Sequence, residues 1–259
     1  MTLPLLMPPV RSTIGPSLLV VDGRSAVVTA LQRTSPEELV LTGDASFVIA
    51  FQSWLGEWLE GKSIARTADL ITYGPRYNEV ERSSFASARI TRLSFPSLAA
   101  DLPGPAHSSG RAYITLRLQV TGETQMPGSG KQVSGDRFVS RLEWFRGDFY
   151  FRVGDRYKPT RISEIICPAP GVVQDIQVRT FDSYFEEFDR LRRFGGSPLT
   201  VVGFGSQGWY DLGLFQLACN SRLTQLIRDP RAVRMPLDLR EKTPLDFTLS
   251  IVRPHLLVP

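Results

Sequence analysis

A segment in the first half of the chain alternates strictly between polar and apolar side chains, and this pattern constrains the fold more than any other. In Ala112–Val120, one set of side chains is polar or amphipathic (Tyr113, Thr115, Arg117 and Gln119), and the other is aliphatic (Ile114, Leu116, Leu118 and Val120). Successive side chains of a strand point to opposite faces of a sheet, so the segment predicts an antiparallel strand with one buried face. Strand-type patterns recur at 18–21, 25–31, 88–93, 149–153, 161–166, 172–179, 199–202, 209–218 and 246–252.

Helical spacing occurs in two segments. Aromatic and apolar residues recur at three- and four-residue steps from Phe47 to Leu59, after Gly43-Asp44 and before Gly61. The same spacing runs from Phe181 to Leu191. Each segment predicts an amphipathic helix, with glycine available to end the first one.

The two halves of the chain follow the same order of elements. Leu19–Leu31 and Phe151–Ser163 each contain a strand, a Gly/Asp turn and a second strand, and each precedes a helix. Matching elements stay about 133 positions apart, which indicates an internal duplication. We therefore expect a mostly β fold with two helices (α+β), built as two tandem β-sandwich or barrel domains with one helix each. The expected division is an extended N-terminal arm at 1–16, a first domain at 17–135 and a second domain at 136–259, with a Gly-rich linker or loop at 121–135 and a Pro/Gly/Ser loop at 99–110.

Composition excludes several functional classes. With 42% hydrophobic and 22% charged residues among 259, the chain is globular and not disordered. A net charge of +4 argues against a dedicated nucleic-acid binder. No apolar run approaches the ~20 residues of a membrane-spanning helix, and the Pro-rich start lacks the basic region of a signal peptide, so we expect cytoplasmic assembly.

Several short motifs resemble nucleotide-binding, metal-binding or catalytic sites, but the residues around them do not fit such sites. Gly203–Gly208 fits G-x-G-x-x-G but precedes a strand-like segment, whereas a dinucleotide site needs a helix there. Gly128–Lys131 lacks the flanking residues of a phosphate loop. Two cysteines and two histidines (Cys167, Cys219, His107 and His255) show no zinc-ligand spacing, and neither histidine has a nucleophile and acid in a recognisable order. We therefore predict no catalytic, cofactor-binding or metal-binding residues, and no enzyme.

The sequence nevertheless resembles a known family. Ala88–Leu98, with its Phe95-Pro-Ser-Leu corner, is followed by a polar loop and by Ala112-Tyr-Ile-Thr-Leu-Arg-Leu118. This arrangement is similar to the tail-tube protein family of contractile-tailed phages and extracellular contractile injection systems. In the second half, Asp148–Gly154, Thr160–Ser163 and Leu212–Leu217 look like a second copy. The resemblance covers roughly residues 17–255 and implies two tail-tube-like domains.

The resemblance also implies a function. Family members pair edge to edge around a ring that lines a channel. Ordinary members have one domain, so the doubled length suggests a specialised tube-end protein, namely a cap adaptor, a terminator or a baseplate piece that initiates the tube. The implied partners are further copies of the chain (a hexamer or a pseudo-sixfold trimer), the inner-tube protein and a neighbouring cap or baseplate protein, within a virion-like or released particle. Asn220–Lys242 is interpreted as an Arg-rich loop that reaches a neighbour. The expected interface residues are Arg76, Tyr77, Glu79, Arg92, Arg117, Arg228, Arg231 and Arg234.

Two other classes stay open at this point. A soluble β-rich module could bind a small or acidic ligand near the Arg-rich second helix. A hydrolase could be built on His107 and the adjacent Ser108 and Ser109. The first alternative predicts a monomer with a pocket, and the second predicts an activity that is lost on His107→Ala.

Overall fold

The computed structural model describes residues 16–44, 46–97, 111–138, 144–145, 149–153, 160–162, 164–167, 173–194, 199–206 and 216–257. The first half contains β1 (Ser17–Val21), β2 (Arg24–Ser35), β3 (Glu38–Gly43), α1 (Ser46–Leu59), β4 (Arg66–Tyr73), β5 (Glu79–Ser97), β6 (Arg111–Pro127) and the 3-10 turn η3 (Gly135–Phe138). The second half contains β7 (Trp144–Phe145), β8 (Phe149–Val153), β9 (Thr160–Arg161), β10 (Glu164–Cys167), β11 (Val173–Phe181), η5 (Asp182–Tyr184), α2 (Phe185–Phe194), β12 (Leu199–Ser206), β13 (Gln216–Arg228), η6 (Pro230–Arg234), α3 (Leu237–Arg240) and β14 (Pro244–Leu257). The fold is mostly β, as the alternating patterns predict.

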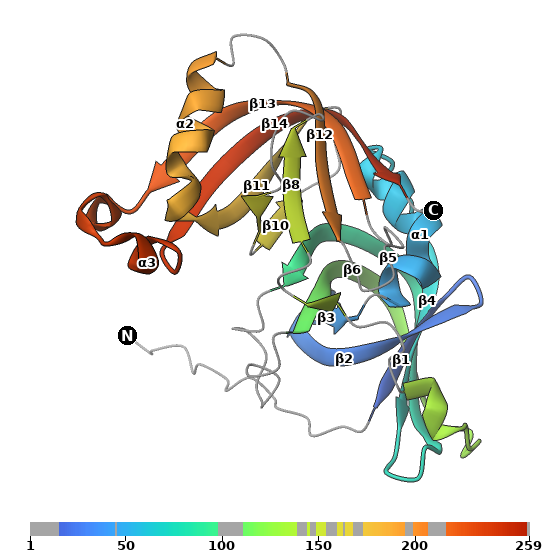
Figure 1. Ribbon diagram of the computed structural model, residues 1–259. Coiled ribbons are helices and arrows are strands. Elements are labelled where there is room, and N and C mark those ends of the chain that lie inside the picture. The colour runs from blue at the N-terminus through green and yellow to red at the C-terminus, as the bar shows by residue number, and fades with distance from the viewer. Residues whose placement is uncertain are drawn as a thin grey trace, which may run out of the picture.

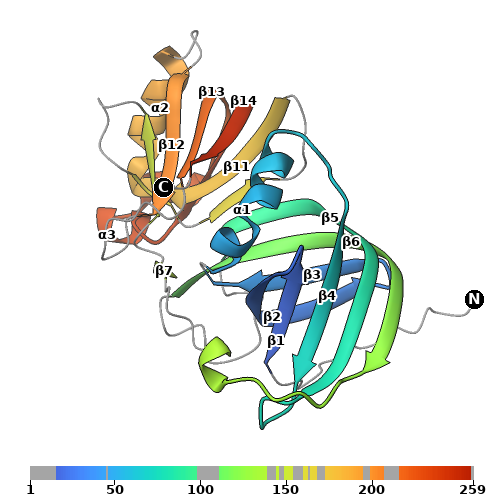
Figure 2. The ribbon, with the colours of Figure 1, turned by 90° about the vertical axis from the view of Figure 1, so that its right-hand side faces the viewer.

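Strands β1 to β6 form a six-strand antiparallel barrel (Figures 1 and 2). The strand order is β6–β3–β2–β1–β4–β5, and β5 pairs with β6 to close the barrel. The predicted turn between β1 and β2 is confirmed, because Asp22 and Gly23 have φ of 50° and 75°, values that a two-residue hairpin turn requires. The aliphatic side chains of the alternating segment line the interior at 0–1% exposure: Ile114, Leu116, Leu118 and Val120.

Helix α1 lies where the two halves of the chain meet. Its start is capped by the Asp44 carboxylate, which accepts a hydrogen bond from the Ser46 amide at 2.8 Å. Its end is marked by Gly61, which has φ of 90° and donates its amide to the Trp58 carbonyl. The helix packs on β2 of the first half and on β14 of the second (Figure 2). The predicted apolar stripe is therefore buried between the halves: Phe47, Val48, Phe51, Trp54, Leu55, Trp58 and Leu59.

The second half repeats the strand pairings of the first. In the first half, β1 pairs with β4, β4 with β5, β5 with β6, β6 with β3 and β3 with β2. In the second half, β8 pairs with β12, β12 with β13, β13 with β14, β14 with β11 and β11 with β10. A helix stands at the same place in both orders, since α1 connects β3 to β4 and α2 follows β11 and precedes β12. β9 pairs with β8 as β2 pairs with β1, so β9 and β10 together correspond to β2.

A direct strand pairing joins the two halves. β10 pairs antiparallel with the C-terminal part of β5, at Ile165↔Phe95, Ile166↔Ser94 and Cys167↔Leu93. The main core is accordingly one contiguous cluster with members from both halves. In the second half, Phe188 of α2 stacks on Phe247 of β14, with ring centroids 4.4 Å apart. The halves are therefore bound to each other by backbone hydrogen bonds and by a shared apolar core.

Two expected loops contain strand, and both expectations need correction. The linker predicted at 121–135 is strand up to Pro127, because residues 121–127 pair with β5, where Gly122 takes φ of 65° beside Ala86. The loop predicted at 220–242 is strand up to Arg228, which is paired with Leu245 of β14. The second helix starts at Phe185, after η5, and not at Phe181. In both loops the pairing with a long neighbouring strand outweighs local composition. Residues 1–15 of the predicted arm and the loop at 99–110 lie outside the described residues.

Candidate subunit interface

The first predicted interface residues lie at the tip of the β4–β5 hairpin. Its turn is tight, since the Gly74 amide donates to the Asn78 carbonyl at 2.8 Å and the Tyr77 amide to the Gly74 carbonyl at 2.9 Å. The Tyr77 ring is 38% exposed and stacks on Phe138 of η3, with centroids 5.3 Å apart. The carbonyl of Arg76 accepts a hydrogen bond from Gln132. The tip is thus a braced projection that presents one aromatic ring, at the lower end of the molecule in Figure 1.

Glu79 supports this tip from the inside. It is 6% exposed and accepts hydrogen bonds from the Arg82 guanidinium at 2.9 and 3.2 Å and from the Ser129 hydroxyl at 2.8 Å. The Arg82 hydrogen bond is the main reason that the pKa of Glu79 lies below its ordinary value, and the Ser129 hydrogen bond lowers it further against the effect of burial. Glu79 therefore anchors the loop after β6 to the start of β5, and its carboxylate faces its own chain.

Arg92 and Arg117 lie opposite each other on β5 and β6. Arg117 forms an ion pair with Glu38 of β3 at 3.0 Å. Within the described part of the chain, Arg92 has no ion-pair partner. Like charges directly opposite on a sheet are destabilising, and the Glu38 carboxylate offsets the charge of Arg117. Arg92 is half-buried on the barrel wall.

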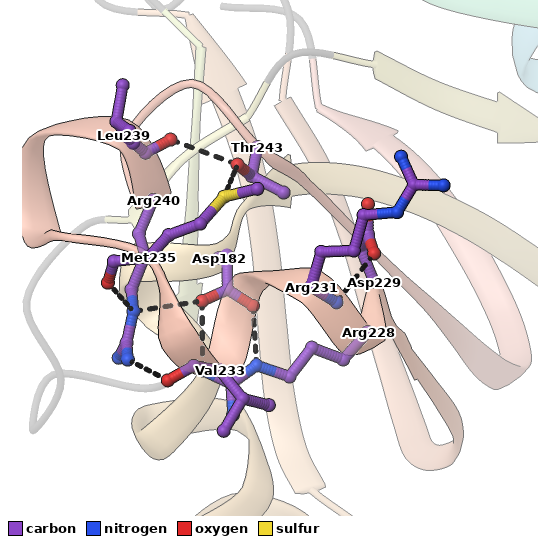
Figure 3. Close-up of polar contacts among 9 residues, drawn as sticks. All are labelled: Asp182, Arg228, Asp229, Arg231, Val233, Met235, Leu239, Arg240 and Thr243. Atoms are coloured by element: carbon purple, nitrogen blue, oxygen red, sulfur yellow. Dashed lines mark hydrogen bonds and ion pairs between the residues drawn. The ribbon is translucent and has the colours of Figure 1, made fainter.

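Arg228 is held by a buried carboxylate (Figure 3). Asp182, at the start of η5, accepts from the Arg228 Nε at 2.6 Å and from its Nη2 at 3.0 Å. The Asp182 side chain is 0% exposed and that of Arg228 is 15% exposed. The Arg228 guanidinium also lies 4.0 Å from the centroid of the Phe185 ring. The hydrogen bond that Arg228 donates to Asp182 is the main cause that raises the pKa of Arg228. The side chain is thus a fixed internal tie between β13 and α2.

Residues 229–243, here called the β13–β14 lobe, extend from this tie at the left side of Figure 1. The Asp229 carboxylate caps η6 by accepting from the Arg231 amide at 2.9 Å. Arg240 donates to the carbonyls of Met235 and Val233, and its Nε lies 3.9 Å from Asp182 (Figure 3). The outer surface of the lobe combines exposed cations with exposed apolar side chains: Arg231, Arg234, Val233, Leu237 and Leu239.

The predicted interface residues therefore do not meet in one site. Arg76 and Tyr77 lie at the hairpin tip, Arg92 and Arg117 on the barrel wall, and Arg231 and Arg234 on the β13–β14 lobe. Glu79 and Arg228 are engaged within the chain. The sequence reasoning did not identify which strands keep unpaired edges. An available signal was the length of the strand-like segments, because a strand longer than its neighbour leaves part of its edge unpaired.

Two such edges lie on β2 and β13. β2 pairs with β1 only from Arg24 to Val28, and no described strand pairs with that edge beyond this point. Every side chain from Leu31 to Glu37 is exposed. β13 pairs with β12 only up to Ser221, and in the described residues no strand covers that edge from 222 to 228. Unpaired edges carry free backbone donors and acceptors, so they are templates for pairing with another chain.

Other kinds of site find no support among the described residues. They contain no cluster of three or more His, Cys, Asp or Glu side chains able to hold a metal ion. In the same part of the chain, no helix has the length and apolar character needed to cross a membrane. No known family matches the sequence, and no curated protein is similar to it.

Proposed function

We propose that the chain is a non-enzymatic structural component of a phage-tail-like contractile injection particle, in which it forms a ring continuous with the inner tube. The observation that carries the proposal is the repeated order of strand pairings, with a helix at the same place in each half. It supports the expectation of two tail-tube-like domains in one chain, at 17–135 and 136–259. Their sequence resemblance to tail-tube proteins supplies the assembly in which such domains act.

The way the halves are joined favours one ring geometry over the other. The two halves share one continuous sheet through β5 and β10, so they lie side by side and not as separate stacked layers. If each half takes one position around a sixfold ring, three chains complete it. We therefore propose a pseudo-sixfold trimer, placed at one end of the tube as a cap adaptor, terminator or tube-initiating baseplate protein. The proposed neighbours are the inner-tube protein and a cap or baseplate protein.

The β13–β14 lobe and the β4–β5 tip suit the contacts of such a ring with its neighbours along the tube. The tip projects from the barrel of the first half and the lobe from the sheet of the second, each on short, hydrogen-bonded supports, and both present exposed apolar side chains. Rigid projections dock at a lower entropic cost than mobile loops. Arg231 and Arg234 on the lobe and Tyr77 at the tip are the residues that we assign to these contacts.

The test is the mass of the purified chain by light scattering over a wide concentration range, followed by electron micrographs of the assembled species. The proposal expects a species of three chains, about 87 kDa from a chain of 28.9 kDa, with a central opening. A six-chain species with an opening supports the ring but contradicts the side-by-side count. A monomer at every concentration overturns the proposal and favours the ligand-binding module.

A further inference from the structure

The pairing that joins the two halves uses an extension of β5 beyond its own barrel. Up to Ala88, one edge of β5 pairs with β4, and further along the same side Leu93–Phe95 pairs with β10. Leu93, Phe95 and Ile165 are each 0% exposed at this junction. At the junction the two strands therefore pair along their edges, and the apolar side chains beneath them are fully buried.

The corresponding strands, β13 and β2, have the same extensions, and no strand of the described residues pairs with them. β13 corresponds to β5, and β2 corresponds to β10, by the pairings that each strand makes. Ile227 on the free stretch of β13 is 52% exposed, and Leu31 on the free stretch of β2 is 37% exposed. Apolar side chains on an open strand edge are a liability that a partner strand removes.

The rows of cross-strand partners in the two halves determine the register in which the free edges of β13 and β2 would pair. In the second half, one row runs from Leu226 through Phe247 and Val178 to Ile165, and then across the junction to Phe95. In the first half, the matching row runs from Leu93 through Leu116 and Leu41 and ends at Leu31. Phe95 lies two residues after Leu93, so its counterpart on β13 lies two residues after Leu226, which is Arg228.

We propose that the free edge of β13 in one copy of the chain pairs antiparallel with the free edge of β2 in a second copy, in the register Leu31↔Arg228, Gln32↔Ile227 and Arg33↔Leu226. This inference rests on the proposed function, because it names the surface through which the ring closes. Each copy uses β13 on one side and β2 on the other, so the contact is head-to-tail, and in the proposed trimer it closes after three copies.

Charge does not oppose this contact. Arg228 is already bound to Asp182, and Arg33 forms two hydrogen bonds of 2.8 Å with the Glu123 carboxylate. The two cations nearest the proposed junction therefore arrive with their counterions in place. The other side chains at 31–35 and 224–227 are neutral: Leu31, Gln32, Thr34, Ser35, Thr224, Gln225, Leu226 and Ile227. Further along the two edges, the same register places Arg222 opposite Glu37, which carry opposite charges.

A disulfide between copies tests both the surface and the register. Gln32→Cys and Ile227→Cys are made as separate variants, mixed in equal amounts and oxidised mildly, with the unaltered chain as the background for Cys167 and Cys219. Side chains directly opposite in an antiparallel pair have Cβ atoms about 4.5–5.5 Å apart, close to disulfide distance. We expect about half of the chains to become linked in pairs, because each mixed ring of three has one matched interface. Neither variant is expected to link alone. Linking of Gln32→Cys with Gln225→Cys in place of Ile227→Cys contradicts the register.

A second variant separates this inference from the proposed function. Ile227→Lys places a charge on the open edge without disturbing the core, and it is expected to weaken self-association at least tenfold by light scattering. Ile64→Lys, at a side chain that is 40% exposed between α1 and β4 and is assigned to no contact, is the matched control and is expected to leave the mass unchanged. If the ring persists with Ile227→Lys and the cysteine variants do not link, the edge pairing is wrong while the ring stands. A chain that is always a monomer overturns both.

Discussion

The Asp182–Arg228 tie gives the sharpest stability prediction, because the same pair of residue types also occurs in an exposed setting. Asp182→Asn leaves the Arg228 guanidinium, 15% exposed, without its carboxylate. Removing one partner of a buried ion pair costs about 3–5 kcal/mol. The Phe185 ring, 4.0 Å from the guanidinium, and the Asn carbonyl both remain to stabilise the cation. We therefore expect a loss near the lower limit, about 3 kcal/mol.

The matched control is Asp246→Asn. Asp246 accepts hydrogen bonds from Arg179 at 2.8 and 3.2 Å, but the side chains are 41% and 42% exposed. Exposed pairs of this kind contribute about 1 kcal/mol or less. The assay is urea unfolding followed by tryptophan fluorescence, with the denaturant slope compared between variants. Equal losses in the two variants, or a loss under about 1 kcal/mol for Asp182→Asn, would refute the argument from burial.

The tie also predicts a local effect. Because Asp182 holds Arg228 and lies beside Arg240, its loss is expected to loosen the β13–β14 lobe before the whole chain unfolds. Trypsin should then cleave after Arg231 and Arg234 faster in Asp182→Asn than in Asp246→Asn. Unchanged cleavage in Asp182→Asn would show that the lobe is held by its own hydrogen bonds alone.

Two further predictions concern the hairpin tip and helix α1. The Arg82 hydrogen bond keeps the pKa of Glu79 below its ordinary value of 4.5, so Glu79 contributes stability that is fully present above that pH and is lost as the pH falls through the folded-state pKa. Glu79→Gln should flatten the acid side of the stability profile, and an unchanged profile would contradict this. Gly128→Ala places a Cβ 2.3 Å from the Glu79 carbonyl oxygen and should cost about 1–3 kcal/mol. Gly56→Ala in α1 meets nothing within 4 Å and should stabilise by about 0.5–1 kcal/mol, as thermal unfolding of both variants would show.

Local patterns predicted many of the elements, because apolar side chains recur every two residues in a half-buried strand and every three or four residues in a helix. The strand around Leu116, the hairpin at Asp22-Gly23 and helix α1 all appear where the spacing places them. β3 and β4 were missed. The apolar run of β3 is short, and β4 mixes Arg66 and Asp69 with apolar residues, so neither gives a clear alternation. The loops expected at 121–135 and 220–242 were wrong in their first residues. These residues have the composition of loops, but hydrogen bonds to a neighbouring strand hold them in the sheet.

The predicted interface residues differ in whether their side chains are exposed or are bound within the chain. Arg231 and Arg234 lie exposed on the β13–β14 lobe, as an outward contact needs. Arg228 is nearly buried because it meets Asp182 from a distant part of the chain. Glu79 is buried because it binds Arg82 three residues away and Ser129 after β6. A sequence shows that a residue is charged, but the partner that neutralises it is a property of the fold.

The sequence alone predicted many of the strands, the two longer helices and a repeated order of elements. The tertiary structure decided which strand edges pair, including β5 with β10, and which remain open on β2 and β13. The physical reason is that every strand presents the same backbone donors and acceptors, whatever its side chains. The choice of partner therefore depends on which apolar faces can close over a common core, and that is settled only when distant segments meet.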